Sequence, residues 1–255
     1  MRDSRAITTE PPPPPADARI AYGREPLQFG DLRLPSGGGP HPLVVAIHGG
    51  FWRATYSLTT TAHLCHALTL RGVATWNLEY RRLGDPGGGW PGTLEDVALG
   101  VRHVRRLAEE HPVEAGDVVL FGHSAGGHLA LWAAREVPTR TVVSLAGVVD
   151  LEEASRRRLG NGVTDELLGG TPDEVPERYQ RASPFALLPL GVRQVLVHGT
   201  DDEVVPFDFS ERYVARACAA GDDTVLVRLD GVGHFEPIDP QSGVFERMLD
   251  LLSGR

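Results

Sequence analysis

Short runs of consecutive apolar residues alternate with longer amphipathic segments along most of the chain. The first run, Leu43 to Ile47, is too short for a typical helix but suits a strand that is buried on both faces of a sheet. Similar runs are Val73 to Tyr80, Val118 to Phe121, Thr141 to Leu145, Val195 to Val197 and Thr224 to Leu229. Continuous apolar strands of this kind are typical of parallel sheets, whose two faces are covered by helices.

Segments of helical length separate these strands. Between Thr93 and Glu110, apolar residues recur at spacings of three and four, which gives a helix one apolar face. The other predicted helices are Leu58 to Leu70, Ala125 to Arg135, Phe207 to Ala219 and Pro240 to Leu252. The alternation predicts an α/β fold with a mostly parallel, doubly wound sheet flanked by helices, and it places active-site groups beyond the carboxyl ends of the strands.

The ends of this pattern and one interruption indicate how the chain is organised. Residues 1–20 contain the run Pro11 to Pro15, which cannot join a helix or sheet interior, and we expect a disordered Pro-rich arm there. A length of 255 residues suits one domain over residues 21–255, which opens with a hairpin-like pair of strands between Ala21 and Leu34. At about residues 150–190, charged residues interrupted by glycine and proline predict a small helical lid insertion.

Charge and composition narrow the functions that the chain could perform. The net charge of -9 disfavours nucleic acid and anionic membranes as partners and favours a small-molecule substrate. All 25 basic residues are arginine, which excludes Schiff-base chemistry and a phosphate-binding lysine. Cys65 and Cys218 are expected to be buried, reduced thiols, and with no signal peptide or membrane span apparent they predict a cytoplasmic protein. A homodimer is a further possibility.

The pentapeptide Gly122-His123-Ser124-Ala125-Gly126 is the strongest chemical signal in the sequence. It lies directly after one predicted strand and directly before a predicted helix, as a G-x-S-x-G nucleophile elbow requires. The turn exposes the serine hydroxyl, and the two flanking glycines let the strand and the helix approach each other. Ser124 is therefore the candidate nucleophile.

A serine hydroxyl is a weak nucleophile at neutral pH unless a base takes its proton and an acid orients that base. His234, in the segment Gly231 to Phe235 after the last strand, is the candidate base. The acid candidates are Asp201 and Asp202, which follow the strand that ends near Val197. The order along the chain is then serine, acid, histidine.

A loop rich in glycine follows the first buried strand. His48-Gly49-Gly50-Phe51-Trp52 exposes backbone N–H groups, and we expect those of Gly49 and Gly50 to bind an oxyanion together with the N–H of Ala125. The histidines show no spacing typical of a metal cluster, so we expect no metal and no cofactor.

Together these segments resemble the α/β-hydrolase superfamily, and within it the arylformamidase and small carboxylesterase group, whose oxyanion loop reads H-G-G-x-W. The likeness extends from about Leu43 to Leu252. It implies an acyl-enzyme mechanism on a small ester or formamide, and it favours Asp202 over Asp201 as the acid. It also implies that the aromatic residues near the motifs line a substrate pocket: Phe51, Trp52, Trp90 and Phe235.

Two other functions are compatible with the same sequence. The first is a peptidase, an amidase or an acyl-transferring biosynthetic enzyme, which would use the same catalytic residues on another substrate. The second is a binding protein without catalytic activity. A complete serine, acid and histidine set disfavours this last function.

Overall fold

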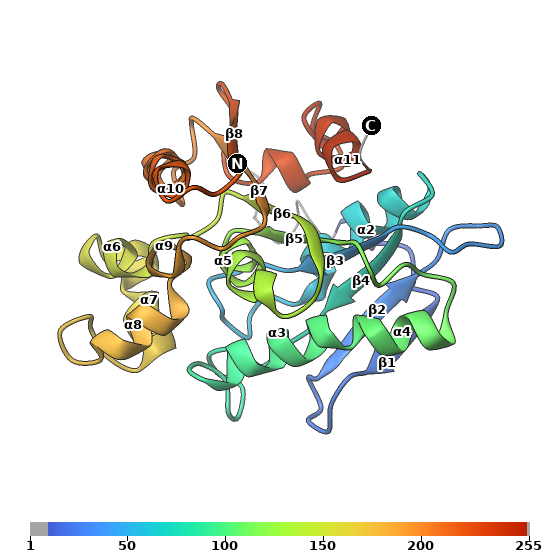
Figure 1. The fold of residues 1–255 in the computed structure, drawn as a ribbon, viewed down its shortest axis with the longest axis horizontal. Helices are drawn as coiled ribbons and strands as arrows, with labels where there is room; N and C mark the ends of the chain where they lie inside the picture. Colours follow the sequence, from blue (N-terminus) through green and yellow to red (C-terminus); the bar gives the residue numbers. More distant parts are fainter. Residues whose placement is uncertain (1–9, 254–255) are drawn as a thin grey trace.

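The computed structural model describes residues 10–253, which contain one eight-stranded sheet in the order β1-β2-β4-β3-β5-β6-β7-β8 (Figure 1). β1 pairs antiparallel with β2 and β2 with β4, whereas the other neighbouring strands are parallel. The mostly parallel sheet is therefore confirmed. The strands are β1 (Ala18–Ala21), β2 (Phe29–Arg33), β3 (Leu43–Ile47), β4 (Ala74–Leu78), β5 (Val118–His123), β6 (Thr139–Leu145), β7 (Arg193–Gly199) and β8 (Thr224–Leu229).

Helices cover both faces of the sheet. The α-helices are α2 (Ala62–Thr69), α3 (Gly92–Arg102), α4 (Val104–Glu110), α5 (Ala125–Trp132), α6 (Leu151–Arg156), α7 (Val163–Leu168), α8 (Pro176–Ala182), α9 (Pro184–Leu187), α10 (Asp208–Ala219) and α11 (Phe245–Ser253). Short 3₁₀ helices are η1 (Leu58–Thr61), η2 (Ala133–Arg135), η3 (Leu159–Asn161) and η4 (Glu236–Ile238). Val45 and Ile47 of β3 pack in the core that contains α3, α4, α5 and α10. Val44 and Ala46 point to the other face, where α2 and α11 lie.

Two predicted helices differ from the structure. The segment from Thr93 to Glu110 is divided at His103, whose ring stacks on Trp76, into α3 and α4. The last helix begins at Phe245, because residues 240–244 form a turn that contains a proline and a glycine.

The predicted disordered arm is wrong for the described residues before position 21. β1 begins at Ala18, and Arg33 donates hydrogen bonds of 2.7 Å to the carbonyl oxygens of Pro14 and Pro15. Prolines have no N–H for a sheet, but their carbonyls still accept hydrogen bonds, so this segment packs along β2 without joining it. Residues 1–9 of the predicted arm lie outside the described residues.

The helical insertion predicted near residues 150–190 consists of α6, α7, α8 and α9, between β6 and β7. It contacts the rest of the domain through a salt bridge between Arg53 and Glu166 (2.8 Å) and a hydrogen bond from the Trp90 N–H to the Leu167 carbonyl (2.7 Å). Of the two cysteines, Cys65 is buried as predicted, whereas Cys218 is exposed on α10. Within residues 10–253, no helix combines the length and the apolar character that a membrane crossing requires.

Candidate active site

Ser124 occupies the tight turn between β5 and α5. Its φ and ψ angles of 57° and -121° lie in a region that non-glycine residues rarely adopt, so the turn is strained. A Cβ atom on Gly122 would lie 2.0 Å from the Gly126 carbonyl oxygen, and one on Gly126 would lie 2.0 Å from the Ile47 carbonyl oxygen. Both flanking positions therefore require glycine, and the chain forms the strand, turn and helix that the motif predicts.

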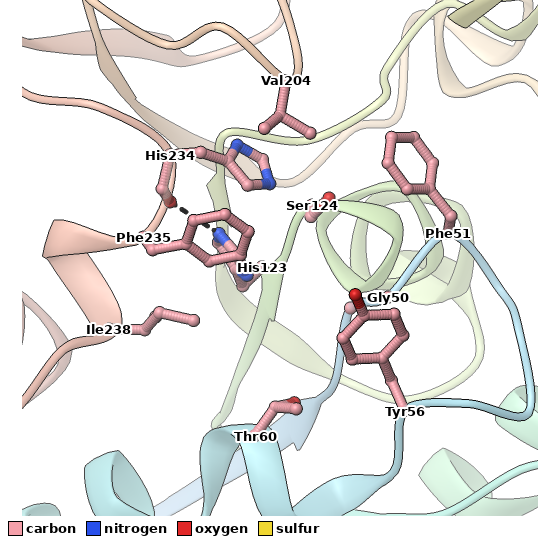
Figure 2. Close-up of a pocket in the computed structure, with 11 residues that line it drawn as sticks. Gly50, Phe51, Tyr56, Thr60, His123, Ser124, Val204, His234, Phe235 and Ile238 are labelled. Atoms are coloured by element: carbon pink, nitrogen blue, oxygen red, sulfur yellow. Dashed lines mark hydrogen bonds between the residues drawn. The ribbon is translucent and has the colours of Figure 1, made fainter. Parts of the chain in front are cut away.

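Asp202 and His234 meet beside this turn. The Nδ1 atom of His234 lies 2.6 Å from Oδ2 of Asp202, and Oδ1 of Asp202 accepts hydrogen bonds of 2.8 Å from the backbone N–H groups of Val204 and Val205. Figure 2 shows the His234 imidazole facing Ser124. Asp201 is exposed and accepts a hydrogen bond from the Thr200 hydroxyl instead. The structure therefore brings together Ser124, Asp202 and His234.

A second histidine contacts the same carboxylate. Nε2 of His198 lies 3.1 Å from Oδ2 of Asp202, and its Nδ1 lies 2.7 Å from the Ser210 hydroxyl. Burial alone raises the pKa of Asp202, but the hydrogen bonds with His198 and His234 outweigh burial, so that this pKa lies below its ordinary value. The carboxylate is thus charged and able to orient His234 at neutral pH.

The loop after β3 runs close to the nucleophile. A Cβ atom on Gly49 would lie 2.6 Å from the His123 carbonyl oxygen and 3.1 Å from the Ser124 Cβ, so only glycine allows this approach. Gly50 has a φ of 104°, a conformation that favours glycine. Ala125 is the first residue of α5, where backbone N–H groups have no partner within the helix. Gly49 and Gly50 line one pocket with Ser124, and Ala125 follows Ser124 directly. The binding of an oxyanion by these three residues stays a prediction.

Buried polar residues that the sequence analysis missed form hydrogen bonds with His48, the first residue of this loop. Nε2 of His48 lies 3.0 Å from a carboxylate oxygen of Glu79, and the Tyr80 hydroxyl donates a hydrogen bond of 2.7 Å to the His48 carbonyl. Arg82 also pairs with Glu79, at 3.0 Å. Burial raises the pKa of Glu79, but His48 and Arg82 lower it by more. The net pKa lies below its ordinary value, so the carboxylate stays ionised. The sequence signal that could have indicated these residues is the run of charged and polar residues Glu79-Tyr80-Arg81-Arg82, directly after a buried strand.

A pocket opens over Ser124, and Figure 2 shows the side chains around it. Of the predicted pocket residues, Phe51 and Phe235 line it. Trp52 and Trp90 do not: the indole of Trp52 is fully buried and donates to Nδ1 of His128 (3.2 Å), while Trp90 packs under Arg181. The remaining lining residues are Gly49, Gly50, Tyr56, Thr60, His123, Ser124, Val204, His234 and Ile238.

Four of these lining residues were missed by the sequence analysis: Tyr56, Thr60, Val204 and Ile238. Tyr56, Val204 and Ile238 lie two to four residues after Trp52, Asp202 and Phe235, and this proximity was the available sequence signal. Thr60 lies farther from any recognised motif. None comes from the insertion at residues 150–190, so a role of that insertion as a lid stays a prediction. A homodimer also stays a prediction.

Comparison with known proteins gives the family and the fold of the chain. The sequence model of the BD-FAE family matches residues 31–216, a segment that includes Ser124 and Asp202 and ends before His234. The chain belongs to the BD-FAE family. The BD-FAE chain also superimposes on a truncated carbohydrate esterase from gut microbiota with a TM-score of 0.79 at 21% identity, covering 94% of this chain and 99% of that one. The α/β-hydrolase fold predicted from the sequence is thereby confirmed.

Two curated relatives of this BD-FAE protein are longer than the segment that aligns with it. It is 26% identical over 244 residues to Esterase LipC of Mycobacterium tuberculosis, which covers 87% of this chain and 60% of LipC. It is 26% identical over 259 residues to a probable isoprenylcysteine alpha-carbonyl methylesterase of Oryza sativa, which covers 91% of this chain and 61% of the plant protein. The chain thus spans about 60% of the length of these relatives.

Two further histidines of the BD-FAE chain, His123 and His128, are buried near the turn at Ser124. His128 accepts from Trp52 through Nδ1, and its Nε2 lies 2.9 Å from the Ala182 carbonyl. Burial lowers the pKa of His128 to about 4 and that of His123 to about 3. Both rings are therefore neutral at the pH of a cell. The His123 ring contacts that of His234, whereas the His128 ring contacts Trp52.

These two lowered pKa values predict that the protein loses stability in mild acid. Between pH 6.5 and pH 5, the unfolded chain binds protons on both histidines while the folded chain does not, so the free energy of unfolding falls as the pH falls. We expect a decrease of about 3 kcal/mol over this interval, measured by urea unfolding. His128→Gln removes one of the two sites and should roughly halve the decrease. An unchanged pH dependence in that variant would contradict the assignment.

Proposed function

We propose that this chain is a serine esterase that cleaves small-molecule esters through an acyl-enzyme. The observation that carries the proposal is the 2.6 Å contact between Asp202 and Nδ1 of His234, on an imidazole that faces Ser124 in its strained turn. This arrangement supplies a nucleophile, a base and an orienting acid in one pocket.

The reaction follows from the positions of these groups. Oγ of Ser124 attacks the ester carbonyl carbon while His234 takes the hydroxyl proton at Nε2. The carbonyl oxygen becomes an oxyanion, and the backbone N–H groups of Gly49, Gly50 and Ala125 are proposed to stabilise it. When the C–O bond to the leaving group breaks, His234 returns the proton to the departing alcohol. Water then attacks the acyl-enzyme with His234 again as base, which frees the acid and restores Ser124.

Aryl formamides are the second substrate class that we propose. The pocket beside Ser124 is lined mainly by apolar groups, including Phe51, Phe235 and Ile238, and no aspartate, glutamate or arginine side chain lines it among the described residues. Such a pocket favours neutral substrates with an aromatic or short aliphatic part. A formyl group is also the smallest acyl group that Ser124 could accept.

A panel of substrates tests this proposal. We expect short-chain aryl esters to give the highest kcat/KM, because an aryloxide is a better leaving group than an anilide anion. Formanilides should follow, and peptide anilides, which carry a larger acyl group, should react at least about 100-fold more slowly than the esters. Rates are measured by release of the chromogenic alcohol or amine, with Ser124→Ala as the blank. A preference for peptide anilides would indicate a peptidase instead, and no turnover of any substrate would favour a binding protein.

The location of this activity is proposed to be the cytoplasm. Both cysteines are free thiols, and Cys218 is exposed on the surface of α10. An exposed free thiol is typical of proteins that work in a reducing compartment.

A further inference from the structure

His123 reaches from the nucleophile turn to the loop that carries the base. It is the last residue of β5, directly before Ser124, and its Nε2 lies 2.9 Å from the backbone carbonyl oxygen of His234 (Figure 2). The two imidazole rings also contact each other, with centroids 4.6 Å apart. The contact joins residues that are 111 positions apart in the sequence.

The chemistry of this contact fixes the protonation of His123. A carbonyl oxygen only accepts hydrogen bonds, so Nε2 of His123 carries the proton and donates it. The ring is 4% exposed, and burial holds its pKa near 3, so that the ring stays neutral and Nδ1 carries no proton. A neutral ring can lie against His234 without opposing the positive charge that His234 acquires during catalysis.

Other contacts hold the residues on either side of His234. The N–H of Asp201 donates to the Val232 carbonyl (3.0 Å), and the N–H of Ile238 donates to the Phe235 carbonyl (3.0 Å). These bonds connect the loop to the end of β7 and to η4. The bond from His123 connects the backbone of the base itself to β5, the strand that positions the nucleophile.

We propose that His123 is a positioning residue, which sets the distance between His234 and Ser124 by donating a hydrogen bond to the His234 carbonyl. The inference rests on the proposed function, in which His234 is the base for Ser124. A small displacement of a catalytic group can reduce the rate by about 100-fold, so this bond should affect kcat more than KM. The second residue of the G-x-S-x-G turn then has a role in the catalytic geometry.

Two substitutions separate the hydrogen bond from simple packing. His123→Leu fills a similar space without a donor, and we expect kcat on a short-chain aryl ester to fall about 10- to 100-fold while KM changes less than about threefold. His123→Gln offers an amide N–H to the same carbonyl and should recover kcat to within about fivefold of the original protein. His103→Leu, which removes a ring stacked on Trp76 away from the pocket, is the matched control and should leave kcat unchanged.

Proton NMR gives a second readout that does not depend on turnover. The His234 proton shared with Asp202 should give a downfield resonance, because the two heavy atoms are 2.6 Å apart. In His123→Leu we expect this proton to exchange with water at least about tenfold faster, which broadens its resonance. In His123→Gln the resonance should keep its original width. The proposal is overturned if His123→Leu leaves both kcat and the resonance unchanged, or if His123→Gln loses as much as His123→Leu.

The two proposals can fail separately. If Ser124→Ala retained turnover, the proposed function would be wrong, but the resonance of His234 in the two His123 variants would still decide whether His123 positions that ring.

Discussion

Replacing Ser124 with alanine is expected to lower kcat on any ester substrate by at least about 10⁴-fold. The substitution removes the only atom that forms the covalent bond to the acyl group, and it leaves the backbone of the turn as it is. Glycine at positions 122 and 126 still allows β5 and α5 to approach. The rate is measured with a short-chain aryl ester, and the melting temperature is measured alongside it.

The control for this variant is Ser36→Ala, which changes an exposed serine in the connection after β2. It should keep the full rate. A Ser124→Ala protein that is folded and retains more than about a tenth of the original kcat would show that another group attacks the substrate.

The second large effect is expected at the acid. Asp202→Asn should lower kcat by about 10⁴-fold, as the loss of the orienting carboxylate does in serine proteases. Oδ2 of Asp202 is shared by His198 and His234, at 3.1 and 2.6 Å. An amide cannot supply a charged acceptor to both rings, so His234 loses the orientation and the negative charge that stabilise its protonated form.

Asp201→Asn is the matched control for this prediction, since it makes the same chemical change one residue away. Asp201 is exposed and contacts Thr200, so we expect kcat to stay within about twofold of the original. Both rates are compared under saturating substrate. The opposite ranking would move the role of the acid to Asp201 and contradict the geometry of the site.

The sequence predicted those parts of the protein that depend on neighbouring residues. Consecutive apolar residues such as Leu43 to Ile47 are buried on both sides, which is typical of a strand covered by two layers of helices. The proposed catalytic residues were predictable because each lies at or shortly after the carboxyl end of a strand: Ser124 directly after β5, Asp202 after β7 and His234 after β8. Gly122 and Gly126 are required by the turn itself, so the local sequence also points to Ser124 as the proposed nucleophile.

Features that depend on distant contacts could not be predicted in this way. Trp52 ends the glycine-rich loop and was therefore predicted to line the pocket, but its N–H donates to His128 and the ring is buried. Tyr56 lies in the connection between β3 and η1, and Ile238 lies in η4. Neither segment has a repeating pattern, and only the folded chain brings these residues to the pocket at Ser124. The hydrogen bond from His123 to the His234 carbonyl likewise joins residues 111 positions apart, so neither the segment around Ser124 nor the segment around His234 predicts it alone.

Covalent labelling with a fluorophosphonate, followed by intact-mass measurement, tests the central claim most directly. The original protein should gain the mass of one adduct, and Ser124→Ala should gain none, because the reagent reacts only with a serine that has been activated by its base. A folded original protein without an adduct, or an adduct that persists in Ser124→Ala, would contradict the assignment of Ser124 as an activated nucleophile.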